Sequence, residues 1–258
     1  MTSERFAGFD GAELALHRIG PKTGSARPLV LLHGLFSSAA MNWIKWGHAA
    51  TLADAGYEVL MPDLRAHGHS AAPHAAAAYP PDVLARDLAA LIAQLGLGEY
   101  DLGGFSLGAR TAVRGVIGGL KPQRLVLGGM GLEGLTGGTR RRNFFVDAID
   151  RFDTVKPGDP AYFAVQFMKS MAVDRVAARL LLGAMADTDP AALRSVSMPT
   201  LVVCGDQDRD NGSPGKLVDA LPDAGLAVIP GTHMSCVTKP DLGLAIRDFL
   251  MQPTSSRT

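Results

Sequence analysis

Short apolar runs separated by longer amphipathic segments make up most of the chain. The runs do not alternate apolar with polar positions, and they lie at residues 28–32, 57–61, 100–105, 124–129, 200–204 and 226–229. A continuous apolar run of this kind is typical of a strand buried on both faces, and the segments between the runs have the length of helices. The pattern predicts an α/β fold, with a mostly parallel central sheet and helices on both of its faces.

Two regions depart from this pattern. Near the N-terminus, Asp10-Gly11 is a strong hairpin-turn signal and predicts that two short strands meet there. In the segment 132–196 the apolar residues lie at helical spacings, and no strand is predicted. We interpret this segment as a helical lid inserted after strand six, with residues 1–131 and 197–258 forming the core. A helical extension that lies away from any site is the alternative.

A serine lies between two glycines at the point where a predicted strand leads into a predicted helix. The sequence there reads Gly104-Phe105-Ser106-Leu107-Gly108. A strand that enters a helix through one residue strains that residue, and the neighbours two positions away must then lack side chains. Such a turn lifts the serine hydroxyl to a helix N-terminus, which favours a developing negative charge. We predict a nucleophile at Ser106; a turn that merely contains a serine is the alternative.

With this motif, the chain resembles the α/β-hydrolase superfamily, and the resemblance covers nearly its whole length. The run HGLF that begins at His33 is similar to the superfamily's His-Gly motif after strand three. The segment 62–73, PDLRAHGHSAAP, is similar to its D-x-R-G-x-G-x-S loop, with Ala66 where glycine is usual. The resemblance implies the α/β-hydrolase fold, a lid after strand six, and an oxyanion hole formed by the backbone N–H groups of Leu35 and Leu107.

A serine nucleophile needs a base, and the base needs an orienting acid. The resemblance implies that His233 is the base, because it stands in a Gly-x-His turn directly after the last predicted strand. The acid follows strand seven within the sequence GDQDRD, where the pattern G-x-x-D selects Asp208 and leaves Asp206 as the alternative. We expect Asp206 and Asp210 to form turns by bonding their own backbone. The chain order is then Ser106, Asp208, His233.

Apolar side chains of the HGLF motif, of the loop before the insertion and of the insertion itself are the candidates for contact with a substrate. We select Phe36, Met130, Phe163 and Phe167. Their alternative role is plain core packing. The insertion has few obvious charge clamps, which favours an apolar acyl group. The arginine triplet at 140–142 is interpreted as the solvated start of a helix.

The resemblance implies a serine hydrolase that cleaves a small or medium apolar carboxylic ester through an acyl-enzyme, with no metal and no organic cofactor. A lactonase, a carbon–carbon bond hydrolase and a perhydrolase are alternatives on the same triad, because fold and triad do not set the substrate. A hydrolase-like receptor that binds a ligand with little turnover is the alternative from another class. A serine at this turn argues against the superfamily's aspartate-nucleophile epoxide hydrolases and dehalogenases.

The composition limits the kinds of binding partner and the cellular compartment that the sequence predicts. The chain has 25 Lys+Arg and 25 Asp+Glu, and this zero balance gives no electrostatic footprint for nucleic acid or anionic lipid. Its 2 cysteines provide no disulfide framework and no zinc-binding spacing. We expect neither a secretory signal nor a membrane helix. The expectation is therefore a cytoplasmic protein whose partner is a small ester, with the oligomeric state left open.

Overall fold

The computed structural model describes residues 2–21 and 26–253. The sequence assigns residues 1, 22–25 and 254–258 to the core, but they lie outside these ranges. The described strands are β1 (Thr2–Ala7), β2 (Glu13–Ile19), β3 (Arg27–Leu32), β4 (Tyr57–Pro62), β5 (Asp101–Phe105), β6 (Leu125–Gly128), β7 (Thr200–Gly205) and β8 (Ala224–Ile229). The α-helices are α1 (His48–Asp54), α2 (Val83–Gln94), α3 (Leu107–Ile117), α4 (Leu132–Thr136), α5 (Thr139–Asp150), α6 (Tyr162–Ser170), α7 (Arg175–Gly183), α8 (Pro214–Ala220) and α9 (Pro240–Leu250). Shorter helical turns are η1 (Ala40–Ile44), η2 (Ala76–Ala78), η3 (Pro190–Ser195) and η4 (Cys236–Thr238).

The strands form one sheet in the order β1-β2-β4-β3-β5-β6-β7-β8. β1 pairs antiparallel with β2, β2 pairs antiparallel with β4, and the neighbours from β4 to β8 are parallel. The apolar runs of the sequence therefore form β3 to β8, and the Asp10-Gly11 turn lies between β1 and β2. The predicted mostly parallel α/β sheet is confirmed.

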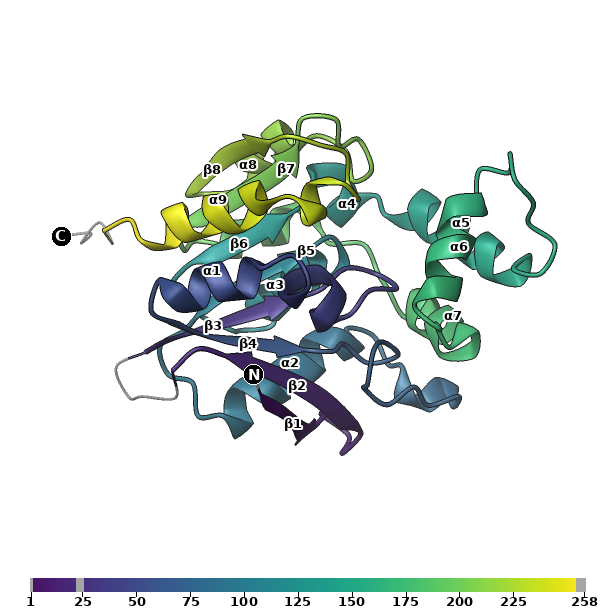
Figure 1. The fold of residues 1–258 in the computed structure, drawn as a ribbon, viewed down its shortest axis with the longest axis horizontal. Helices are drawn as coiled ribbons and strands as arrows, with labels where there is room; N and C mark the ends of the chain where they lie inside the picture. The colour runs from purple at the N-terminus through teal and green to yellow at the C-terminus, as the bar shows by residue number, and fades with distance from the viewer. Residues whose placement is uncertain (1, 22–25, 254–258) are drawn as a thin grey trace.

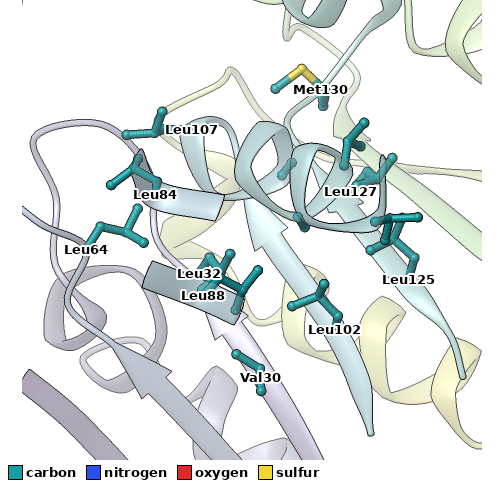
Figure 2. Close-up of a cluster of buried hydrophobic side chains, with 14 of the residues drawn as sticks. Val30, Leu32, Leu64, Leu84, Leu88, Leu102, Leu107, Leu125, Leu127 and Met130 are labelled. Carbon is teal, nitrogen blue, oxygen red and sulfur yellow. The ribbon is translucent and has the colours of Figure 1, made fainter. Parts of the chain in front are cut away.

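Helices cover both faces of the sheet (Figure 1). α2 and α3 pack on one face, where Leu32 and Leu102 of the sheet lie in one buried cluster with Leu84 and Leu88 of α2 (Figure 2). α1 and α9 contribute buried side chains to a second cluster on the opposite face. Full burial of one such side chain stabilises the fold by roughly 1.5–3 kcal/mol. These two layers fix the carboxyl ends of the parallel strands at one edge of the sheet, which is where α/β proteins bind ligands.

A helical insertion, residues 132–196, separates β6 from β7. All of its residues are described, and they fold into α4 to α7 and η3 without a strand. α5, α6 and α7 gather beside the sheet (Figure 1) around a small apolar cluster of their own. Phe36, from the loop after β3, packs into this cluster, with its ring 5.4 Å from the ring of Phe145. The predicted helical content is confirmed, whereas action as a lid stays a prediction.

Arg110 of α3 joins the two ends of the helical insertion. Its Nη1 donates to the carbonyl oxygens of Gly134 and Leu135 at 2.7 and 3.2 Å, near the start of the insertion. Its Nη2 donates to the carbonyl of Ala186, near the end, and lies 3.7 Å from the Asp187 carboxylate. Burial lowers the pKa of the Arg110 guanidinium. Because this buried side chain spans both ends, it fixes the insertion to the core next to Ser106.

Candidate active site

Ser106 is the single residue between β5 and α3, and its backbone is strained as the sequence predicts. It has φ 54° and ψ −110°, in a region that residues with a side chain rarely adopt. A Cβ at Gly104 would collide with the backbone of Gly108, and a Cβ at Gly108 would collide with the carbonyl of Leu32. Both glycines are therefore needed for the close approach of the helix to the sheet.

Ser106, His233 and Asp208 form a chain of hydrogen bonds between buried side chains. Oγ of Ser106 lies 3.0 Å from Nε2 of His233, and Nδ1 of His233 lies 2.8 Å from Oδ2 of Asp208. A carboxylate only accepts, so Nδ1 carries the proton and Nε2 of the neutral ring is free to accept from the serine hydroxyl. Burial opposes the charge of Asp208, but the hydrogen bond from His233 holds the pKa of that carboxyl below its ordinary value.

The loop of Asp208 and the loop of His233 are tied together by Asp206. Its Oδ1 accepts the backbone N–H of Gly231 at 2.7 Å, and the N–H of Gln207 donates to the Gly231 carbonyl at 3.0 Å. The expectation that Asp206 bonds its own loop is therefore wrong, because the acceptor it supplies holds the loop that carries the base. Asp208 itself accepts the N–H of Asp210 at 3.0 Å through its other oxygen.

Asp210 also departs from its expected role as a turn residue. Its Oδ2 lies 3.1 Å from Nη2 of Arg141, which belongs to α5 of the helical insertion. A carboxylate that pairs with a guanidinium across two segments holds them in register. The acid loop of the core is thereby connected to the insertion.

Leu35 and Leu107, the predicted oxyanion residues, lie close to Ser106. They line the same cavity as Ser106, and a Cβ added to Gly34 would lie 3.7 Å from Cβ of Ser106. Among the described residues, the backbone N–H groups of Leu35 and Leu107 have no hydrogen-bond acceptor. Two unpaired N–H groups beside a serine hydroxyl are the donors that a developing oxyanion requires.

Two buried polar side chains hold the loop that contains Leu35. His33 accepts the N–H of Leu64 at Nε2 over 2.9 Å, so its proton is on Nδ1, which donates to the Gly34 carbonyl at 2.8 Å. The N–H of Gly34 donates to Oδ1 of Asn42 at 3.1 Å. Burial lowers the pKa of His33 and keeps the ring neutral. No pattern in the sequence pointed to Asn42 as a residue of the site.

The cavity beside Ser106 has a volume of about 320 Å³ and mixed walls. Its apolar lining residues are Leu35, Leu107, Met130, Phe145, Leu182 and Met185. Its charged lining residues are Arg110, Glu133, Arg140, Arg141, Arg142, Asp187, Arg209 and Asp210. The arginine triplet does start a helix, α5, but it faces this cavity rather than solvent alone.

Comparison with known proteins agrees with this architecture. Residues 27–114 match the family model of the alpha/beta hydrolase fold. A hydrolase structure from Pseudomonas aeruginosa aligns over 97% of this chain and 99% of its own, with a TM-score of 0.77 and 23% identity. An esterase structure from Rhodococcus sp. aligns over 97% of this chain and 98% of its own, with a TM-score of 0.72 and 25% identity.

The chain therefore has the α/β-hydrolase fold. A putative non-heme chloroperoxidase from Synechocystis sp. is 28% identical over 242 residues, which cover 81% of this chain and 84% of that protein.

Of the four side chains expected to contact a substrate, the structure places Met130 in the cavity wall. Phe36 packs against Phe145, which lines the cavity, and so lies behind the wall. Phe167 packs against the apolar cluster of the helical insertion, and Phe163 is 82% exposed. None of these three phenylalanines is among the residues that line the described cavity. Helical spacing identified α6 as amphipathic but did not show which way it faces.

Asn211 is a site residue that sequence reasoning missed. It is buried, its Nδ2 donates to the carbonyl of Gly129 at 2.7 Å, and the same nitrogen lies 3.5 Å from Oγ of Ser106. This side chain fixes the loop after β6 next to the serine. Its position three residues after Asp208 was the available signal, but one asparagine in a polar loop is most simply a turn residue.

Three further features of the described residues concern metal binding, membrane helices and cysteine thiols. Among these residues, no group of three or more His, Cys, Asp or Glu side chains is arranged to hold a metal ion. None of the described helices has both the length and the apolar character needed to cross a membrane. Cys204 and Cys236 are buried, and burial raises the pKa of each thiol to about 12. Both thiols are therefore protonated and unreactive near neutral pH.

Proposed function

We propose that this chain is a serine hydrolase that cleaves a small or medium carboxylic ester. The observation that carries the proposal is the buried chain of hydrogen bonds from Ser106 through His233 to Asp208, at 3.0 and 2.8 Å. The strained turn at Ser106 supports it, because such a turn holds the hydroxyl in reach of a base and at a helix N-terminus.

The proposed reaction has two halves. Oγ of Ser106 attacks the ester carbonyl while Nε2 of His233 takes its proton, and the N–H groups of Leu35 and Leu107 bind the oxyanion. His233 then gives this proton to the leaving alcohol, which leaves an acyl group on the serine. A water molecule attacks the acyl carbonyl with His233 as base, and the acid departs as the proton returns to Oγ. Asp208 orients the imidazole and stabilises its charged form.

The cavity sets the size of the proposed substrate. At about 320 Å³ it is near the small end of the range for ligand sites, roughly 300–1,000 Å³. Leu35 and Met130 of the core and Phe145 and Leu182 of the helical insertion all line it. The insertion, residues 132–196, is thus proposed to act as a lid over a core formed by residues 1–131 and 197–258.

A fluorophosphonate probe tests the nucleophile. It is expected to add covalently to the wild-type protein at Ser106, as read by peptide mass mapping, and to leave the Ser106→Ala variant unlabelled. Ester hydrolysis by that variant is expected to fall by roughly a millionfold in kcat, the scale of nucleophile loss in triad enzymes. A label on Ser37 or Ser235 contradicts the assignment. A single slow turnover in the wild-type protein points instead to a ligand-binding receptor.

A further inference from the structure

Arginine side chains are concentrated around the cavity that contains Ser106. The whole chain has a formal net charge of +0, yet among the described residues that line this cavity 5 are arginine and 3 are acidic. The arginines are Arg110, Arg140, Arg141, Arg142 and Arg209. Such an excess of one sign in a partly enclosed site raises the local concentration of ligands of the opposite sign.

The acidic side chains of the cavity already have partners. Asp210 pairs with Arg141 at 3.1 Å, and Glu133 pairs with Lys216 at 3.2 Å. Asp187 accepts the N–H of Gly138 and the hydroxyl of Thr139 at 3.0 and 3.1 Å. These carboxylates therefore do not neutralise the charges of Arg140, Arg142 and Arg209.

Three of the arginines have no carboxylate partner within the described part of the chain: Arg140, Arg142 and Arg209. Arg142 donates one hydrogen bond to the carbonyl of Met185 at 2.6 Å and a longer one to the hydroxyl of Thr139 at 3.4 Å. Arg209 donates to the carbonyl of Asp208 at 3.0 Å. Each guanidinium has five N–H groups, so most of these donors stay available to a ligand.

Helix stability does not explain the position of the triplet. Arg140, Arg141 and Arg142 lie in the first turn of α5, which has no acidic residue there and no side-chain cap. The positive end of a helix dipole disfavours cations at this position. The triplet is therefore locally unfavourable and adds its charge to that of the helix N-terminus beside the cavity.

From these observations we infer that the substrate carries a carboxylate, which Arg140 and Arg142 bind while the ester carbonyl lies at Ser106. The inference rests on the proposed function and names its substrate class. A planar guanidinium matches a carboxylate with two parallel hydrogen bonds, which gives orientation as well as affinity. The apolar lining residues then contact the carbon chain between the two groups. On this inference the substrate is not wholly apolar, whereas the sequence favoured an apolar acyl group.

Matched ester pairs test the inference. On the acyl side, 4-nitrophenyl hydrogen glutarate is compared with 4-nitrophenyl pentanoate, and on the alcohol side, 4-carboxybenzyl acetate is compared with benzyl acetate. We expect kcat/KM to be at least about tenfold higher for the charged member of one pair, which corresponds to ~1.4 kcal/mol. The preference is expected to shrink in about 0.5 M salt, because counterions screen the arginines.

Two variants separate the proposed contacts from general charge effects. The double variant Arg140→Gln/Arg142→Gln is expected to lose most of the preference for the charged ester. Arg179→Gln removes a positive charge from the same insertion, but Arg179 pairs with Asp150 on the exposed surface and is not among the cavity residues. This control is expected to keep the preference. A preference below about tenfold in both pairs, or one that survives in the double variant, overturns the inference.

Binding measurements test the proposed carboxylate site even if the protein does not cleave any ester. If no ester of either kind is cleaved, the hydrolase proposal fails, and calorimetry with glutaric acid monoanilide and pentananilide then tests the anion site alone. Tighter binding of the charged anilide, lost in the double variant, supports the inference. Equal binding of the two anilides overturns it.

Discussion

The cavity beside Ser106 has two walls of different construction. The core wall is set by backbone contacts so close that glycine is required at Gly104 and Gly108, and its polar groups are buried and hydrogen-bonded. The insertion wall presents long side chains from α5, among them Arg140 and Arg142, and is fastened by a few polar contacts such as those of Arg110.

The difference assigns separate tasks to the two walls. Attack on a carbonyl needs atoms placed within a few tenths of an ångström, which rigid strand ends and tight turns provide. Recognition of a substrate group tolerates more freedom, since an arginine reaches its partner along a flexible stem. We therefore expect substitutions in the core wall to remove activity or stability, and substitutions in the insertion wall to alter the choice of substrate.

After the loss of the nucleophile in Ser106→Ala, the largest effect is expected for the Asp208→Asn variant. Asp208→Asn keeps the shape of the side chain but removes the charge that stabilises the protonated His233, and it lets the ring adopt the wrong tautomer. By analogy with other triads, kcat near neutral pH is expected to fall roughly ten-thousandfold, or ~5.5 kcal/mol. Steady-state kinetics with a 4-nitrophenyl ester measure this loss.

Asp206→Asn is the matched control for Asp208. An asparagine oxygen can still accept the N–H of Gly231, so the loop of His233 is expected to stay in place with a far smaller loss of kcat. Thermal melts of both variants establish that they are folded. A greater loss at Asp206 than at Asp208 would assign the acid to Asp206.

The next effect concerns the stability of the core wall. Gly104→Ala forces a methyl group into the backbone of Gly108, and we expect a loss of about 3 kcal/mol or more in the free energy of unfolding, the upper range for overpacking. Gly183→Ala, at the end of α7, is the control, because nothing lies within 4 Å of the added carbon. It is expected to be neutral or stabilising by up to about 1 kcal/mol. Urea unfolding compares the two, and similar losses would contradict the contrast between the walls.

Arg110 connects the core wall to the insertion wall, and its substitution is expected to loosen the insertion wall. Arg110→Met fills a similar space but leaves the carbonyls of Gly134 and Ala186 without their donor, whereas the carbonyl of Leu135 keeps the N–H of Thr188. One buried carbonyl left unpaired costs about 1–3 kcal/mol, and water reaching the loosened ends reduces the total to roughly 2 kcal/mol. Hydrogen exchange is expected to accelerate in α5 to α7 while β3 and β5 stay protected. Uniform acceleration across the sheet would show that Arg110 supports the core instead.

The sequence predicted the core wall well because its signals are local. Strand-length apolar runs, the glycines around Ser106 and the Gly-x-His turn each act within a few residues, and the structure has the corresponding strands and turns. The bond from Asp206 to Gly231 and the buried Asn211 depend on segments that meet only in the folded chain. The same holds for the insertion, where helical spacing gave the helices but not the faces that they turn to the cavity.

The smallest effect is expected for the Phe163→Ala variant, which tests the orientation of α6. The helical spacing favoured a substrate contact, but the side chain is 82% exposed and is not among the cavity residues. Phe163→Ala is therefore expected to change the free energy of unfolding by less than about 0.5 kcal/mol, as surface substitutions usually do. It is also expected to leave the dependence of kcat/KM on acyl length as in the parent.

Phe145→Ala gives the contrast, because Phe145 lines the cavity, packs edge-to-face on Phe36 and lies under the guanidinium of Arg141 at 5.1 Å. Its removal widens the insertion wall, so longer acyl groups are expected to gain in kcat/KM relative to acetate. If Phe163→Ala shifts the acyl-length preference as strongly as Phe145→Ala, then α6 turns its exposed face inward when substrate binds. The insertion wall would then be a moving part, and the recognition assigned to its arginines would depend on closure rather than on a preformed cavity.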